Sequence, residues 1–169
     1  MVSTDVPRVP KETSEPPLSI QRLPGYALAE AFRMMRHAMD DALRDVDLTT
    51  PQWGTLVCLG EREGLTGADM ARIHHLTPQT MHTILQNLET AGLVVRDRDP
   101  EHGTLLRTHL TRMGRERLVE AMTRVQVVQE RLVSDLNKQE RETLIDLLHR
   151  CARSIRVEGA SPVSDMCID

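Results

Sequence analysis

The sequence predicts a mainly α-helical fold with a small β-hairpin wing, an α+β class, and three observations lead to this prediction. Apolar residues recur at alternating spacings of three and four along several stretches, which is the period of an amphipathic helix. The pairs Thr50-Pro51 and Thr77-Pro78 are typical of a helix N-cap followed by a proline in the first turn. Two short strand-like runs flank a turn over residues 99–103, and they predict a hairpin.

A first helix is expected over about residues 24–46. Its apolar stripe has alternating spacings of four and three and consists of Leu28, Phe32, Met35, Met39, Ala42 and Val46. A polar segment ends this helix, and Thr50 is expected to cap a second helix that stops near Gly64. Thr66 is expected to cap a short third helix over residues 67–75.

Thr77 is expected to cap a fourth helix, which begins at Pro78 and stops at Gly92, a natural C-terminal glycine. Its apolar face consists of Met81, Ile84, Leu85 and Leu88. Strand-like residues at 93–96 and 105–110 then form the hairpin. A hairpin that directly follows two helices joined by a tight turn is a winged helix-turn-helix.

Thr111 is expected to cap a long fifth helix, and a sixth helix should begin at about Lys138. Their apolar stripes consist of Leu118, Met122, Val125, Leu132 and Leu136, and of Leu144, Leu148, Cys151 and Ile155. Such stripes need a partner that buries them.

The chain is expected to form a single domain over residues 24–157, with the winged helix-turn-helix core at about 48–114. Residues 1–23 contain prolines among polar residues and are expected to form a flexible arm. Residues 158–169 are similar in composition and are expected to form a flexible tail.

The composition excludes several classes of protein. No apolar run approaches the ~20 residues of a membrane span and no signal-peptide core is present, so we expect a cytoplasmic protein without a membrane partner. The net charge of −4 argues against a nonspecific nucleic-acid coat, and an aromatic content of 2% argues against a single-strand binder that stacks bases. No phosphate loop, nucleophile elbow or HExxH motif occurs, so neither an enzyme nor a cofactor is predicted.

The cysteines have no metal-ligand spacing, and their odd number argues against a disulfide framework. Cys58 and Cys151 lie within apolar helical patterns and are expected to be buried thiols, whereas Cys167 lies in the tail. The neighbouring His74 and His75 invite a metal site, but adjacent residues of a helix point in different directions and no further ligand set completes a tetrahedron. No metal site is therefore predicted.

The fourth helix is the expected DNA-reading helix, because the second helix of a helix-turn-helix pair lies in the major groove. The candidate contacts opposite its apolar face are Thr77, Gln79, Thr80, His82, Thr83, Gln86 and Asn87. Gln and Asn side chains can hydrogen-bond adenine bidentately, and a Thr methyl group can contact thymine. A helix that merely faces solvent shows the same pattern, so the hairpin that follows strengthens the DNA-binding interpretation.

The wing region must supply the positive charge, since no Lys or Arg occurs over residues 77–91. We expect contacts with phosphates or the minor groove from Arg96, Arg98, His102, Thr104, Arg107 and Arg112. Asp97, Asp99 and Glu101 alternate with these arginines, so several of the arginines could instead form surface ion pairs.

Short motifs follow one another in a fixed order between residues 28 and 155. They are Leu48-Thr-Thr-Pro-Gln-Trp53, Leu56-Val-Cys-Leu59, Gly64-Leu65-Thr66, Ala68-Asp69-Met70-Ala71, Leu76-Thr-Pro-Gln-Thr80, Leu88-Glu89-Thr-Ala-Gly-Leu-Val94 and Leu110-Thr111-Arg-Met-Gly114. In this order and spacing they resemble the MarR family of winged helix-turn-helix transcriptional regulators. The resemblance covers nearly everything except the two tails.

The resemblance implies a homodimer whose dimerisation helices, at about 24–46 and 111–157, interlock. It also implies a repressor that binds a pseudo-palindromic operator in double-stranded DNA and responds to a small phenolic or carboxylate effector. The effector pocket implied between the first, second and fifth helices would be lined by Phe32, Met35, Arg36, Met39 and Trp53. Arg36 could pair with an anionic ligand, whereas the apolar members are equally explained as core residues.

Two places depart from the family's pattern. Thr83 and Asn87 stand where the family's DNA-reading helix often carries arginines, and residues 102–104 replace the Asp-x-Arg of its wing tip. These departures predict weaker and less salt-dependent DNA binding than is usual for the family. They also leave open a winged-helix dimer that has lost DNA binding and acts as a protein-interaction module, and the histidines leave open a pH- or metal-responsive regulator.

Overall fold

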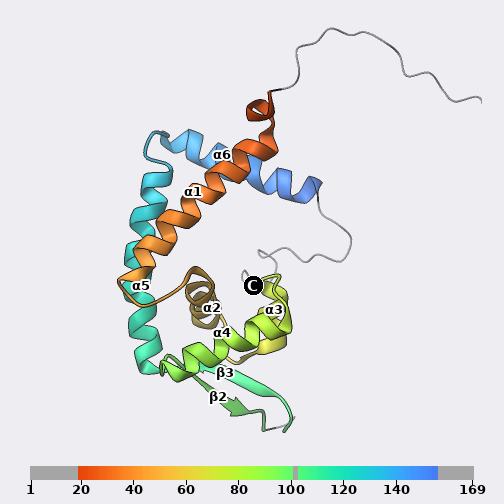
Figure 1. Ribbon diagram of the computed structural model, residues 1–169, viewed down its shortest axis with the longest axis vertical. Helices are drawn as coiled ribbons and strands as arrows, with labels where there is room; N and C mark the ends of the chain where they lie inside the picture. The colour runs from red at the N-terminus through yellow and green to blue at the C-terminus, as the bar shows by residue number, and fades with distance from the viewer. Residues whose placement is uncertain (1–18, 101–102, 156–169) are drawn as a thin grey trace, which may run out of the picture. The chain divides into compact units, whose positions relative to one another are not determined.

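The computed structural model describes residues 19–100 and 103–155. These residues form a mainly helical fold with one small antiparallel sheet (Figure 1). The elements, in order, are η1 (Ile20–Arg22), α1 (Pro24–Arg44), α2 (Thr50–Glu61), β1 (Leu65–Thr66), α3 (Gly67–Ile73), α4 (Pro78–Thr90), β2 (Val94–Arg98), β3 (Leu106–Leu110), α5 (Arg112–Leu132) and α6 (Lys138–Ser154). The predicted order of helices and hairpin is confirmed, and η1 and β1 are additions that the sequence did not predict.

The internal contacts divide the chain into two units, residues 1–34 and residues 35–169, and the boundary falls within α1. In the described part of the first unit the large apolar side chains are exposed: Ile20, Leu23, Tyr26, Leu28, Phe32 and Met34. The second unit contains the remainder of α1, whose Met39 and Leu43 are buried, and every later element.

Side-chain caps determine where the helices begin. Threonines cap α3, α4 and α5 at the predicted positions. The predicted cap at Thr50 is wrong, because Thr49 caps α2 in a reciprocal arrangement in which the side chain of Gln52 accepts the Thr49 N–H at 2.9 Å. The Thr50 hydroxyl donates instead to Asp40 at 2.5 Å, and so ties the first turn of α2 to α1.

The sheet has the strand order β1-β3-β2. β2 and β3 form the predicted hairpin, with Val94 opposite Leu110 and Arg98 opposite Leu106. β1 pairs with the other edge of β3. A strand of two residues has no measurable alternation, which explains why the sequence did not predict β1.

The core lies between α2, α3, α4 and the inner face of the sheet, with the end of α1 and one face of α5 closing it. Its largest fully buried side chains are Leu43, Leu56, Leu59, Met70, Met81, Leu85, Leu88, Val46, Thr55 and Thr108. The whole predicted apolar face of α4 is buried, so the opposite face of this helix is fixed toward solvent.

The stripes predicted on α5 and α6 are only partly buried within the chain. On α5, Leu118 and Val125 join the core, whereas Met122 and Leu132 remain 53% and 46% exposed. None of the residues of α6 is buried. The prediction that Cys58 is buried is confirmed, but the prediction for Cys151 is wrong for the single chain, because no described element covers its face of α6.

Candidate nucleic-acid interface and ligand groove

α4 presents one uninterrupted polar face to solvent. Its candidate residues are all exposed: Thr77, Gln79, Thr80, His82, Thr83, Gln86 and Asn87. The side chains of Met81, Ile84, Leu85 and Leu88 hold the other face in the core. Since α3 braces this helix from the preceding turn, the polar face is presented by a rigid support rather than by a loop.

The threonines and the longer side chains of this face have different roles. The hydroxyl groups of Thr77 and Thr80 lie 2.8 Å apart at the helix start, and the Thr83 hydroxyl donates to the Gln79 carbonyl at 3.2 Å. Within the described residues, no hydrogen bond engages the side chains of Gln79, His82, Gln86 or Asn87. These are the groups of α4 that are ready to hydrogen-bond an external partner.

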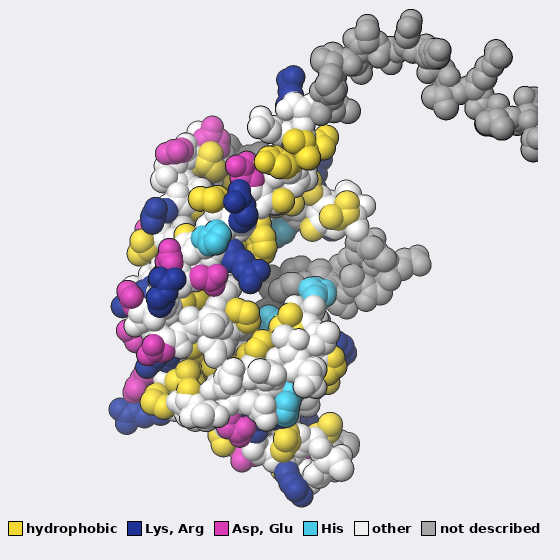
Figure 2. All heavy atoms as spheres, viewed as in Figure 1, with side chains coloured by type: hydrophobic (Ala, Val, Ile, Leu, Met, Phe, Trp, Pro, Cys, Tyr) yellow, Lys and Arg dark blue, Asp and Glu magenta, His cyan; other side chains and the backbone are white. Residues whose placement is uncertain are grey.

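α4 contains no Lys or Arg, so any cation beside this face comes from another element. Arg72 of α3 pairs with Asp69, and Arg112 at the start of α5 pairs with Glu116 at 2.9 Å. Basic and acidic side chains are interspersed along the side of the second unit formed by α5 (Figure 2). Positive charge around α4 is therefore partly neutralised by ion pairs, the alternative that the sequence had left open.

The predicted wing residues separate into three groups. Arg98 and Thr104 are exposed, and Arg98 makes no ion pair within the described residues. Arg96 is half-buried on the inner face of the sheet, with its Nε buried and without a hydrogen-bond partner in the described structure. Arg107 is held by other parts of the protein, and His102 lies outside the described residues.

A polar groove of about 500 Å³ lies where α1 meets α2, within the second unit. It is lined by Arg36, Asp40, Arg44, Leu48, Thr49 and Pro51. Of the five predicted effector residues, only Arg36 lines this groove. Met39 is core, Met35 and Trp53 pack half-buried against the core, and Phe32 is an exposed residue of the first unit.

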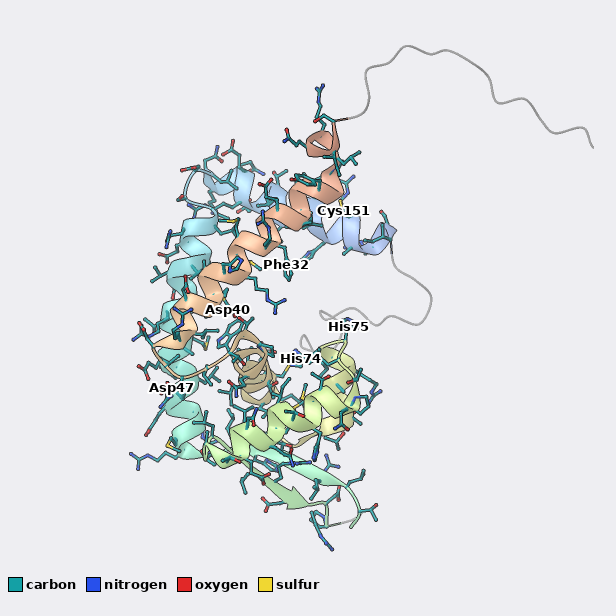
Figure 3. The ribbon with its side chains drawn as sticks, in the orientation of Figure 1. Phe32, Asp40, Asp47, His74, His75 and Cys151 are labelled. Carbon is teal, nitrogen blue, oxygen red and sulfur yellow. The ribbon has the colours of Figure 1, made fainter. Side chains whose placement is uncertain are left out.

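A second polar feature lies between α2 and the end of α3. The Nε1 of Trp53 and the Nε2 of His74 are both buried and have no hydrogen-bond partner in the described structure. The imidazole of His74 packs on Gly54, because a Cβ atom at Gly54 would lie 3.1 Å from His74 Cε1. Figure 3 labels His74 and the neighbouring His75. Burial, together with the neighbouring charge of His75, lowers the pKa of His74 below its ordinary value.

The sequence did not predict that His74 would lie on α2. The available signal was Gly54, since a glycine in the middle of a helix often marks a close approach by another group. His75, in contrast, is exposed and has a positive φ of 51° at the turn that leads into α4. Among the described residues, no cluster of three or more His, Cys, Asp or Glu side chains could hold a metal ion.

Comparison with known proteins places this arrangement in a family. The family model for the MarR family matches residues 46–103. The HTH-type transcriptional repressor Rv2887 of Mycobacterium tuberculosis is 34% identical over 119 residues, which are 70% of this chain and 86% of the relative. The chain belongs to the MarR family of transcriptional regulators.

Solved structures of the same MarR-family relative agree with this assignment. Rv2887 in complex with DNA has a TM-score of 0.66 and 29% identity, and the match covers 76% of this chain and 97% of the relative. Rv2887 in complex with salicylic acid has a TM-score of 0.63 and 30% identity, and the match covers 82% and 98% of the two chains. Among residues 19–100 and 103–155, none of the helices combines the length and the hydropathy that a membrane span needs.

Proposed function

We propose that this MarR-family chain is a homodimeric repressor that binds double-stranded DNA at a pseudo-palindromic operator and is modulated by a small ligand. The observation that carries the proposal is the exposed polar face of α4, which is supported by α3 and followed by a hairpin. A helix held in this way fits the major groove of B-DNA, and the hairpin reaches the flanking backbone. The complex of the relative Rv2887 with DNA supports DNA as the partner.

The side chains of α4 favour sequence selectivity over high affinity for DNA. Gln79, Gln86 and Asn87 are free to make bidentate contacts with adenine, and His82 can reach a base or a phosphate. Because α4 carries no Lys or Arg, attraction to phosphates has to come from surrounding cations such as Arg98 and from the helix N-terminus. We infer modest affinity with a shallow salt dependence.

The apolar surface of α5 and α6 supports the homodimer. Large hydrophobic side chains remain exposed there: Val119, Met122, Val127 and Leu132 on α5, Ile145, Leu147 and Leu148 on α6, and Ile155 at the C-cap of α6. A helix without any buried residue gains its stability from packing against something else, and a second copy of the chain is the partner we propose.

The groove between α1 and α2 supports an anionic effector. Arg36 and Arg44 lie on one side of it, and a guanidinium suits a carboxylate. The relative's complex with salicylic acid makes an aromatic carboxylate the first class to test. Trp53 and His74, with buried and unpartnered ring nitrogens, are candidates to hydrogen-bond a ligand that enters between α2 and α3. Beyond the effector, we propose that the protein has no catalytic activity and needs no cofactor. We propose that it is located in the cytoplasm, where its DNA lies.

Selection from a random-sequence duplex library with the purified chain tests the proposal. The wild-type chain should enrich a palindromic motif. Gln79→Ala should relax preference at one position in each half-site, whereas Arg98→Ala should weaken all sequences alike and lower the salt slope by about 0.9 per lost phosphate contact. Lys138→Ala, which removes an exposed cation remote from α4, serves as the control.

The cation-free α4 also favours one competing function, a winged-helix dimer that binds another protein. In that case the library would show no enrichment even at low salt.

The effector is tested by adding salicylic acid at a salt concentration at which the chain binds its duplex. The proposed regulator loses affinity for its enriched duplex, and the groove variant Arg36→Ala loses this response while its DNA affinity without salicylic acid is unchanged.

A further inference from the structure

Arg107, which the sequence suggests as a phosphate ligand, is instead bound within the protein. Its Nε donates to Asp99 Oδ2 at 2.6 Å, and its Nη2 lies 2.6 Å from the same oxygen. Its Nη1 donates to the carbonyl oxygen of Gly64 at 3.0 Å. One guanidinium therefore joins the residue that follows β2, the middle strand β3 and the turn that precedes β1.

The two ends of this connection are themselves well fixed. The Asp99 side chain is only 4% exposed, and its backbone N–H donates to the Leu105 carbonyl at 2.9 Å, which closes the base of the wing turn. Gly64 has a positive φ of 76° and its N–H donates to the Thr108 carbonyl at 3.1 Å. Arg107 thus links the wing turn to the helix-turn-helix through two rigid anchors.

We infer that Arg107 is a positioning residue, which holds the wing at a set distance from α4 and does not itself bind phosphate. We name the group of Arg107, Asp99 and the Gly64 carbonyl the wing clamp. The planar guanidinium suits this role, because it can contact a carboxylate and a carbonyl oxygen in different directions at once. The inference rests on the proposed DNA-binding function.

A phosphate contact by Arg107 would work against this geometry. Its charge is already compensated by the buried Asp99 carboxylate, and three of its five N–H groups are engaged within the protein although the side chain is 46% exposed. Arg98 offers the contrast, since it is exposed, lies two strand positions from Arg96 on β2 and makes no ion pair within the described residues. The clamp leaves Arg98 as the wing cation that is available to DNA.

Two substitutions separate the roles by the sign of their effects. Asp99→Asn removes a negative charge near the DNA, so a purely electrostatic Arg107 contact predicts unchanged or tighter binding. The wing clamp predicts a loss of affinity instead, by roughly tenfold for residues of one hydrogen-bond network. Arg107→Lys keeps the positive charge but loses the planar set of N–H donors that reaches two acceptors at once. The clamp therefore predicts the same loss of DNA affinity, whereas a phosphate contact would be largely preserved.

The measurement is the affinity for the duplex that the wild-type chain enriches from the random library, taken as a function of salt. If the clamp is correct, three variants should lose affinity to a similar extent and keep the wild-type salt slope: Asp99→Asn, Arg107→Lys and the double variant. Arg98→Ala, as the matched control, should have a reduced slope. A reduced slope for Arg107→Ala, together with full affinity for Arg107→Lys or Asp99→Asn, would overturn the inference.

Amide hydrogen exchange on the DNA-free chain provides a second and independent measurement. Asp99→Asn and Arg107→Lys should speed exchange over residues 94–110 without speeding it in the core of α2 or α5. Unchanged exchange in the hairpin would overturn the clamp even if affinity falls. A wild-type chain that binds no duplex would overturn the proposed function instead, and the exchange data would still decide on the clamp.

Discussion

Gly114 occupies a point where two backbones meet. A Cβ atom at this position would overlap the carbonyl oxygen of Leu93, which also accepts the Thr111 N–H at 3.1 Å. We expect Gly114→Ala to lower the free energy of unfolding by about 3 kcal/mol, because the wing and α5 would have to separate. Urea denaturation measures this change. Gly103→Ala is the control, since a Cβ atom there meets nothing within 4 Å, and equal midpoints for the two variants would contradict the explanation.

His74 makes stability depend on pH. Its pKa is lowered by burial and by the neighbouring His75, so the folded chain resists protonation while the unfolded chain takes up a proton below about pH 6.5. The free energy of unfolding should therefore fall as pH drops from 7 to 5. His74→Gln should show a shallower fall, measured by urea denaturation at each pH, while exposed His82→Gln should follow the wild type. Parallel curves for all three proteins would argue against this role of His74.

At the scale of elements, the start of α3 depends on a reciprocal cap. The Thr66 side chain accepts the Asp69 N–H at 3.2 Å, and Asp69 Oδ2 accepts from the Thr66 hydroxyl at 2.7 Å. Burial by itself raises the pKa of Asp69, but the hydrogen bonds from Thr66 and Arg72 outweigh this effect and lower the pKa overall. The carboxylate thus contributes stability above about pH 4 that is lost as pH falls further.

This cap predicts the behaviour of Asp69→Ala. The variant should lose about 1 kcal/mol of unfolding free energy at pH 7, a typical value for a helix cap. The difference from the wild type should shrink as pH falls below about 4, because the wild-type carboxylate takes up a proton there. Thermal denaturation over this pH range measures the difference, with exposed Asp97→Asn as the control. A gap that stays constant down to pH 3 would show that the carboxylate charge is not involved.

At the scale of the whole molecule, the exposed apolar faces of α5 and α6 predict that folding and association are coupled. The melting temperature should rise with protein concentration, because a partner that binds only the folded chain stabilises it.

Ile145→Glu should weaken association more than tenfold, since an unpaired carboxylate buried in an apolar interface costs several kcal/mol. Sedimentation velocity measures this loss. Val95→Glu changes an exposed apolar residue of the wing and should associate normally; equal weakening by both substitutions would contradict the interface on α6.

Features that depend on neighbours within a dozen residues could be predicted from the sequence alone. The threonine caps of α3, α4 and α5 and the buried face of α4 follow from local hydrogen bonds and from the helical period, and the structure has them at the predicted positions. The polar face of α4 follows from the same period. Its residues were therefore identified as candidates for DNA contact, and that role remains a prediction for binding experiments.

Features that depend on distant partners could not be predicted and follow from the fold. Arg107 looked like any other wing arginine, but its guanidinium reaches the Gly64 carbonyl, which is 43 positions away in the sequence. Likewise, Thr50 bonds to Asp40 of α1 and leaves the cap to Thr49, and His74 packs on Gly54. A charged or polar side chain can satisfy its hydrogen bonds with any suitable group within reach, so its role depends on which groups the fold brings within a few ångströms. The spacing of apolar residues along a buried helix face does not depend on distant partners, because it is set by the geometry of the helix itself.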